Sequence, residues 1–235
     1  MTAAADNLND PFWTYEDLGL FVGSVLPSFG LAAIIVRLSR LSGDAAKTLL
    51  YQSLTYVLLT AVLYLLIAWR YHRPFWRSLG WAEAYRGAWL CVVAGPVLAV
   101  ITTVLGVVLR APQVPSQVVN LITDRRSLEI VGLFVTILGP VFEELTFRGF
   151  LFPLLRRSLG VWPGILLTAA PFALMHGSQY HWAWQQLLVV GVAGTAFGYA
   201  RQKTQSTFAA AMVHASYNTT LFVGYLFQRA AYSAV

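Results

Sequence analysis

Long apolar segments, separated by short stretches that hold most of the charges, constrain the fold of this chain more than any other feature. We count seven of them, and they lie at 18–36, 48–69, 87–109, 128–155, 161–176, 185–200 and 207–227. A helix needs about 20 apolar residues to cross a membrane, so the fifth and sixth segments are marginal on their own. The pattern predicts an all-α bundle of about seven transmembrane helices, with a count of six or eight still open.

The composition supports a membrane protein and argues against a nucleic-acid partner. Charged residues make up 11% of the chain and hydrophobic residues 57%, whereas soluble domains carry roughly 25% charged residues. The net charge is +6, but the Lys and Arg residues lie singly or in small groups beside the apolar segments. That arrangement is typical of membrane helices. We therefore expect one integral membrane domain over residues 1–235, with membrane lipid as its surroundings.

Two adjacent glutamates follow the apolar run 128–142, and Arg148 comes four residues after the second of them. A charge inside a membrane helix costs about 2.5–3.5 kcal/mol on insertion scales, so its presence indicates function or pairing. The spacing places Glu144 and Arg148 on one helix face, where they can pair. Glu143 points about 100° away, and we interpret it as the carboxylate left free for chemistry. A purely structural ion pair is the alternative.

Three further polar residues lie inside later apolar segments. His176 ends the fifth segment, and His214 and Asn218, four residues apart, share one face of the seventh. A lone histidine in an apolar helix is usually a structural donor. Two of them, together with an amide and a glutamate pair, predict a polar cavity inside the bundle.

Two prolines stand shortly before these polar groups. Pro140 and Pro171 each remove a helix hydrogen bond, which should free the carbonyls of Thr136 and Leu167. A membrane helix tolerates such irregular backbone where it is buried in protein or lines a wet cavity. The glycines of the sixth segment are different, because Gly194-x-x-x-Gly198 predicts close helix packing and nothing more.

The polar residues form three motifs in chain order: Glu143-Glu144-x-x-x-Arg148, Phe172-x-x-x-His176 and His214-x-x-x-Asn218. Their order and spacing resemble the three motifs of the CPBP family, which includes the CAAX prenyl endopeptidases and the related bacterial proteins of the ABI group. The motifs cover residues 143–218, inside the predicted catalytic helices 128–227. The first three apolar segments add only a hydropathy pattern.

The resemblance implies an intramembrane endopeptidase that hydrolyses a peptide bond in a membrane-associated protein or peptide. Four residues would carry the chemistry: Glu143 as the base that activates water, His176 as the group that holds this water, and His214 and Asn218 as oxyanion donors. Three would support the site: Glu144, Arg148 and Phe172. We expect a multi-pass protein of a prokaryotic cytoplasmic membrane. The distribution of Lys and Arg weakly favours a cytoplasmic amino terminus and a glutamate site open to the cytoplasm.

Two alternatives stay open. In a zinc-dependent version, Glu143, His176 and His214 would be three zinc ligands, with water in the fourth position. We prefer a site without cofactor or metal, because no compact His-x-x-x-His pair is present. In the second alternative the protein is not catalytic and serves as a bacteriocin-immunity factor, a scaffold or a proton-coupled carrier. Carriers also use intramembrane Glu and His, but many show internal repeats, and we see none.

Overall fold

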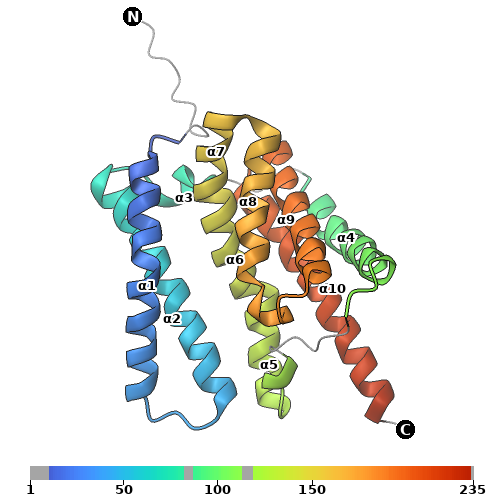
Figure 1. Cartoon of the computed structure of the whole chain (residues 1–235). Helices are drawn as coiled ribbons and strands as arrows, with labels where there is room; N and C mark the ends of the chain where they lie inside the picture. Colours follow the sequence, from blue (N-terminus) through green and yellow to red (C-terminus); the bar gives the residue numbers. More distant parts are fainter. Residues whose placement is uncertain (1–10, 82–86, 113–118, 234–235) are drawn as a thin grey trace, which may run out of the picture.

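The computed structural model describes residues 11–81, 87–112 and 119–233, and every regular element in these ranges is a helix. The all-α prediction is therefore confirmed (Figure 1). The elements are α1 (Tyr15–Leu38), α2 (Asp44–Tyr64), η1 (Leu65–Arg70), α3 (Phe75–Ser78), α4 (Ala88–Val108), η2 (Val119–Leu121), α5 (Arg125–Leu133), η3 (Phe134–Leu138), α6 (Gly139–Glu144), η4 (Leu145–Leu151), α7 (Phe152–Leu159), α8 (Val161–Met175), η5 (Ser178–Tyr180), α9 (Trp184–Thr204) and α10 (Thr207–Ser233).

Four helical stretches of the described chain are long and apolar enough to cross a membrane: Tyr15–Leu38, Asp44–Arg70, Trp89–Val108 and Arg125–Leu159. They lie close to the first four predicted segments, and the shorter apolar α8 matches the fifth. The helices α9 and α10 match the last two segments, although they are more polar. The chain is an integral membrane protein built as a helical bundle, while the count of seven spans stays a prediction.

Local sequence signals explain where several helices begin and turn. Thr14 caps α1 in a capping box with Asp17, and Asp124 caps α5 in the same way with Ser127. Between α7 and α8 the chain reverses at Gly160, whose φ of 87° is a conformation that glycine adopts without strain. An apolar run alone does not determine the residue at which a helix begins or ends, so these local signals determine it here.

The helices form three groups (Figure 1). The α1–α2 hairpin stands on one side, the stretch α6–α9 fills the centre, and α4 and α10 pack together on the other side. The first described residues lie at the same face as the end of α7, because Arg157 donates to the carbonyls of Pro11 and Trp13. The α1–α2 loop lies at the opposite end of the molecule.

Glycines allow the closest helix contacts. A Cβ on Gly95 of α4 would lie 2.0 Å from Ser216 Oγ of α10, so only glycine fits there. In α9, a Cβ on Gly198 would lie 3.1 Å from the Ile165 side chain of α8. The close α8–α9 packing predicted from Gly194-x-x-x-Gly198 is therefore confirmed.

The helix Arg125–Leu159 carries two π-helical segments, η3 and η4, on either side of α6. A π segment widens the turn and re-aims the side chains beside it, and such segments are frequent at functional sites. Here they flank the two glutamates. The irregular backbone that Pro140 predicts is thus present where the polar groups lie.

Candidate active site

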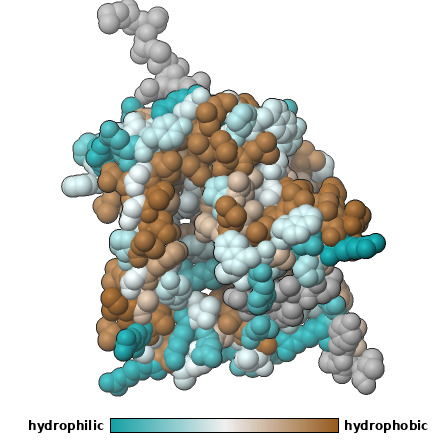
Figure 2. Space-filling model, in the orientation of Figure 1, coloured by the Kyte–Doolittle hydropathy of each residue, from teal (hydrophilic) through white to brown (hydrophobic). Residues whose placement is uncertain are grey.

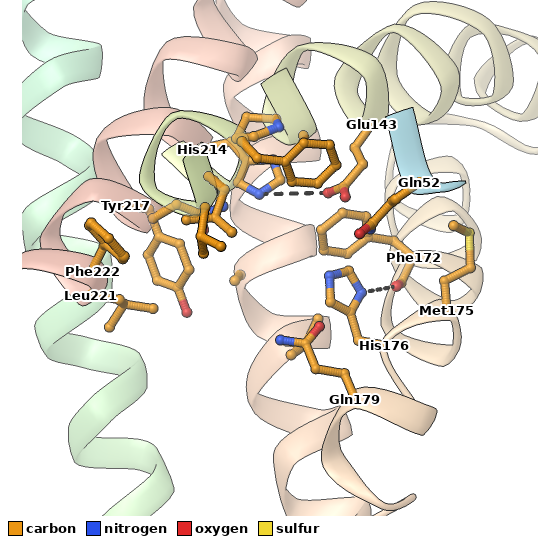
Figure 3. A pocket seen from close by; sticks show the side chains of 18 of the residues that line it. Gln52, Glu143, Phe172, Met175, His176, Gln179, His214, Tyr217, Leu221 and Phe222 are labelled. Atoms are coloured by element: carbon orange, nitrogen blue, oxygen red, sulfur yellow. Dashed lines mark hydrogen bonds and ion pairs between the residues drawn. The ribbon is translucent and has the colours of Figure 1, made fainter. Parts of the chain in front are cut away.

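A cavity of about 310 Å³ lies among α2, α6, α8, α9 and α10. Its wall contains five of the seven predicted site residues: Glu143, Phe172, His176, His214 and Asn218. In Figure 3, Glu143 and His214 point towards each other, and His176 lies on the same wall beside Gln179. Figure 2 shows the surface hollowed between the α1–α2 hairpin and the central helices. The three motifs, which lie far apart in the chain, therefore meet at one cavity.

The remaining two predicted site residues form a buried ion pair behind this wall. Arg148 Nη1 donates to Glu144 Oε1 at 2.8 Å, and both side chains are fully buried. The pairing predicted from the spacing is confirmed. His214 Nδ1 lies 2.9 Å from the same Glu144 oxygen, and the Arg148 guanidinium lies 4.6 Å from the Phe172 ring centroid. One carboxylate oxygen thus joins the helix Arg125–Leu159 to α10.

The same arginine also holds α9, through a residue that the sequence analysis assigns to packing alone. Arg148 Nη2 donates to the carbonyl of Gly194 at 2.6 Å. A Cβ on Gly194 would lie 3.0 Å from the Phe172 ring and 3.2 Å from Arg148 Nη2. Gly194 therefore has two functions, because it gives the guanidinium room and supplies its acceptor.

Glu143 is not the free carboxylate that the sequence predicts. Its Oε1 accepts a hydrogen bond from the Tyr56 hydroxyl at 2.6 Å. Its Oε2 lies 3.8 Å from His214 Nε2, which is longer than a direct hydrogen bond. The side chain is 14% exposed. One oxygen of Glu143 is thus engaged by α2, and the other is turned towards His214.

The two histidines each have one ring nitrogen fixed by an acceptor. His176 Nδ1 lies 2.8 Å from the carbonyl of Phe172, and His214 Nδ1 faces the Glu144 carboxylate. Because carbonyls and carboxylates only accept, both Nδ1 atoms carry a proton. In each ring the Nε2 atom is then left for other partners. The Phe172 ring packs against both imidazoles, with centroids 4.9 Å from His176 and 5.7 Å from His214.

Asn218 explains the irregular winding ahead of the glutamates. In η3 the Gly139 N–H bonds to the carbonyl of Phe134, five residues back. The next residue is Pro140, which has no N–H, so the carbonyl of Val135 lacks a helical donor. Asn218 Nδ2 donates to that carbonyl at 2.8 Å. That Pro140 also frees the carbonyl of Thr136, as the α-helical rule predicts, stays a prediction.

The predicted zinc ligands do not form a metal site in this structure. Among the described residues, no group of three His, Cys, Asp or Glu side chains converges as an ion would require. The Nδ1 contacts of His214 and His176 leave Nε2 of each ring for other partners, which is also the pattern of histidines that bind a metal through Nε2. As the side chains stand, they do not surround one point as a catalytic zinc requires, and a site without metal stays a prediction.

Sequence reasoning missed the contribution of α2 to the cavity. Gln52 and Tyr56 both line the wall, and their spacing of four residues puts them on one helix face. That spacing was the available signal, but a single tyrosine in an apolar segment carries little information. Tyr180, in the loop after α8, also lines the cavity, and burial raises its pKa to about 12, so its hydroxyl stays protonated at neutral pH.

The cavity wall also includes Gln179 and Tyr180 of the α8–α9 loop and Leu49 and Gln52 of α2. The cytoplasmic amino terminus and the opening of the site towards the cytoplasm both stay predictions from the distribution of Lys and Arg.

Comparison with known protein families gives a match over the motif-bearing helices. The family described as type II CAAX prenyl endopeptidase Rce1-like matches residues 126–220. This segment contains all three motifs and lies outside the α1–α2 hairpin and α4. Neither the curated proteins nor the solved structures gave a match.

Proposed function

We propose that this protein is an intramembrane endopeptidase whose water is activated by Glu143, in keeping with the match of residues 126–220 to the Rce1-like family of type II CAAX prenyl endopeptidases. The observation that carries the proposal is the geometry of Glu143. Its Oε2 is turned towards His214 Nε2 at 3.8 Å, inside a cavity that holds four more motif residues. A base must lie within reach of the proton that it removes, and Oε2 can take a proton from a water bound beside it in the cavity.

The reaction that these residues support is direct attack of water on the scissile carbonyl carbon. Glu143 Oε2 takes one proton of the water as the new C–O bond forms, and the carbonyl π electrons move to the oxygen. When the tetrahedral intermediate collapses, the C–N bond breaks and the leaving amine takes the proton that Glu143 holds. Both protons of the water are thus accounted for, since the other stays on the new carboxyl group.

His176 has the role of holding the water. Its Nδ1 proton is directed at the Phe172 carbonyl, so Nε2 is an acceptor. An acceptor at Nε2 can take the second hydrogen of a water whose first hydrogen points at Glu143. The water is then oriented with its lone pairs towards the substrate, which is the arrangement that attack on a carbonyl needs.

His214 and Asn218 have the role of stabilising the oxyanion. His214 donates from Nε2 only when both ring nitrogens carry protons, because Nδ1–H is already directed at Glu144. We assign the donor role to Nε2–H of that ring. Asn218 gives one N–H to the Val135 carbonyl and keeps its second N–H for the substrate oxygen. Donors aimed at a developing charge are worth about 10²–10³ in rate each.

The substrate is a membrane-associated protein or peptide, as the family implies. That the mechanism needs no metal stays a prediction. That the protein lies in a prokaryotic cytoplasmic membrane stays a prediction as well. Comparing the termini of membrane proteins in cells with wild-type protein and with Glu143→Gln would identify the cleaved bond. A peptide spanning that bond then serves as the substrate in lipid nanodiscs.

The test is single-turnover cleavage of this peptide by folded variants. We expect Glu143→Gln to slow cleavage by about 10²–10⁴-fold, since glutamine keeps the volume but cannot take a proton. His176→Ala should follow, and His214→Ala and Asn218→Ala should be milder. The matched control is Glu129→Gln, which removes an exposed carboxylate of the same long helix. Wild-type cleavage by Glu143→Gln would show that another group is the base.

A further inference from the structure

The Tyr56 hydroxyl contacts the proposed base from a part of the chain that the family match does not include. Tyr56 lies on α2, 87 residues before Glu143, and donates to Glu143 Oε1 at 2.6 Å. Hydrogen bonds from a hydroxyl to a carboxylate are short, about 2.5–2.7 Å, and roughly twice as strong as neutral ones. The contact therefore restrains the carboxylate far more than simple packing would.

The direction of this hydroxyl is itself fixed. The Tyr56 ring stacks on Phe134 with centroids 5.9 Å apart and planes 7° apart, and on Phe142 at 5.3 Å and 26°. Both phenylalanines belong to the helix that carries Glu143. One turn earlier on α2, Gln52 lines the same cavity wall. The two rings thus hold the phenol group in a single orientation.

We propose that Tyr56 is a positioning residue, which rests on the proposed function of Glu143 as the base. A carboxylate has two equivalent oxygens and can rotate between them. With Oε1 held by Tyr56, Oε2 is the oxygen turned towards His214 Nε2 at 3.8 Å and towards the water. Tyr56 therefore selects the oxygen that takes the proton. The α1–α2 hairpin is then part of the active site.

The test is Tyr56→Phe, which removes only the oxygen and keeps the ring between its two neighbours. We expect the single-turnover rate constant at saturating substrate to fall by about 10- to 100-fold, because a misplaced catalytic group costs up to about 10²-fold. The substrate concentration at half-saturation should change little, since Tyr56 acts on the base. The matched control is Tyr64→Phe, the same change on the same helix at an exposed residue, which should cleave at the wild-type rate.

Two further measurements separate positioning from folding. The infrared band of the Glu143 carboxylate, identified by its loss in Glu143→Gln, should shift in Tyr56→Phe and stay unchanged in Tyr64→Phe. A Gln52→Leu variant, which leaves the Tyr56–Glu143 bond in place, should lose less activity than Tyr56→Phe. If Tyr56→Phe melts far below the wild type, its rate and carboxylate band are compared with those of the wild type at a temperature where both proteins are folded.

The outcomes distinguish this proposal from the proposed function. A wild-type rate and an unshifted carboxylate band in folded Tyr56→Phe would overturn the role of Tyr56, while Glu143 would still be the base. Equal cleavage by wild type and Glu143→Gln would overturn both. Slow cleavage by Tyr56→Phe with an unchanged melting temperature and a shifted band would establish the positioning role.

Discussion

The α1–α2 hairpin and the motif-bearing helices are held in the bundle in opposite ways. We compare the share of buried residues in the apolar 18-residue stretch of each helix. It is 44% in Arg125–Leu159, against 17% in Tyr15–Leu38 and 22% in Asp44–Arg70. The motif-bearing helices are joined by a buried charge pair and close glycine contacts. The hairpin faces lipid over most of its length and reaches the centre through a few side chains.

It follows that substitutions in the two regions should fail in different ways. In the motif-bearing helices, a lost partner leaves a buried charge, so folding and activity should fall together. In the hairpin, the contacts of Tyr56 and Trp13 with the central helices are hydrogen bonds of uncharged donors, so the bundle should persist when one of them is lost. The following predictions test that division.

The largest effect should come from the buried ion pair. We expect Arg148→Ala to destabilise the protein by about 3–5 kcal/mol, because Glu144 would be left as an unpaired buried charge. The matched control is Arg125→Ala on the same long helix. Arg125 pairs with Glu129 at 3.0 Å, but the two side chains are 92% and 64% exposed, and exposed pairs contribute at most about 1 kcal/mol. Thermal unfolding in detergent measures both, and equal melting temperatures would contradict the burial of the pair.

A smaller effect should come from Asn218, whose amide satisfies the Val135 carbonyl. We expect Asn218→Ala to cost about 1–3 kcal/mol, the usual cost of an unsatisfied buried polar group. In a Pro140→Ala background, residue 140 regains an N–H that can bond this carbonyl in the π register. The cost of Asn218→Ala should therefore be smaller there. Thermal unfolding of the four proteins in this double-mutant cycle measures the coupling, and strictly additive losses would show that Asn218 and Pro140 are unrelated.

The Asn218 contact also shows where sequence reasoning reached its limit. The helix boundaries could be predicted, because long apolar runs and charged flanks determine them. The Glu144–Arg148 pair could be predicted, because a spacing of four residues places two side chains on one face. The π segment η3 could not, since local winding depends on whether a distant donor satisfies the freed carbonyl. That donor, Asn218, lies 83 residues away.

The same limit applies to Tyr56. Its hydroxyl reaches Glu143 only because α2 packs beside α6 with these two residues at the same level. No local sequence pattern determines how two separate helices are aligned along their lengths. The motif residues were predictable as a group because each motif is local and the three resemble those of one family. Contacts between the motif-bearing helices and the hairpin depend on tertiary packing and required the structure.

In the hairpin, a hydrogen bond near the start of α1 should give a modest loss of stability without loss of activity. Trp13 Nε1 donates to the carbonyl of Phe150 at 3.1 Å, and its ring stacks on the Phe150 ring at 5.6 Å. Trp13→Phe keeps an aromatic ring and removes the N–H, so we expect a loss of about 0.5–1.5 kcal/mol. Melting curves measure this loss, and single-turnover cleavage should stay at the wild-type rate. A large loss of activity in the folded variant would show that the start of the hairpin also shapes the site.

The smallest expected effect is that of a chelator on cleavage by the purified protein, which should be none. The buried charges of the site have protein partners, because Glu144 pairs with Arg148 at 2.8 Å and accepts from His214 Nδ1 at 2.9 Å. The Nδ1 atoms of both motif histidines are taken by protein acceptors. The motif-bearing helices are thus held by their own side chains and need no ion to bring them together. Cleavage that is lost with chelator and restored by one equivalent of zinc would contradict this and would require Glu143, His176 and His214 to rearrange around the metal.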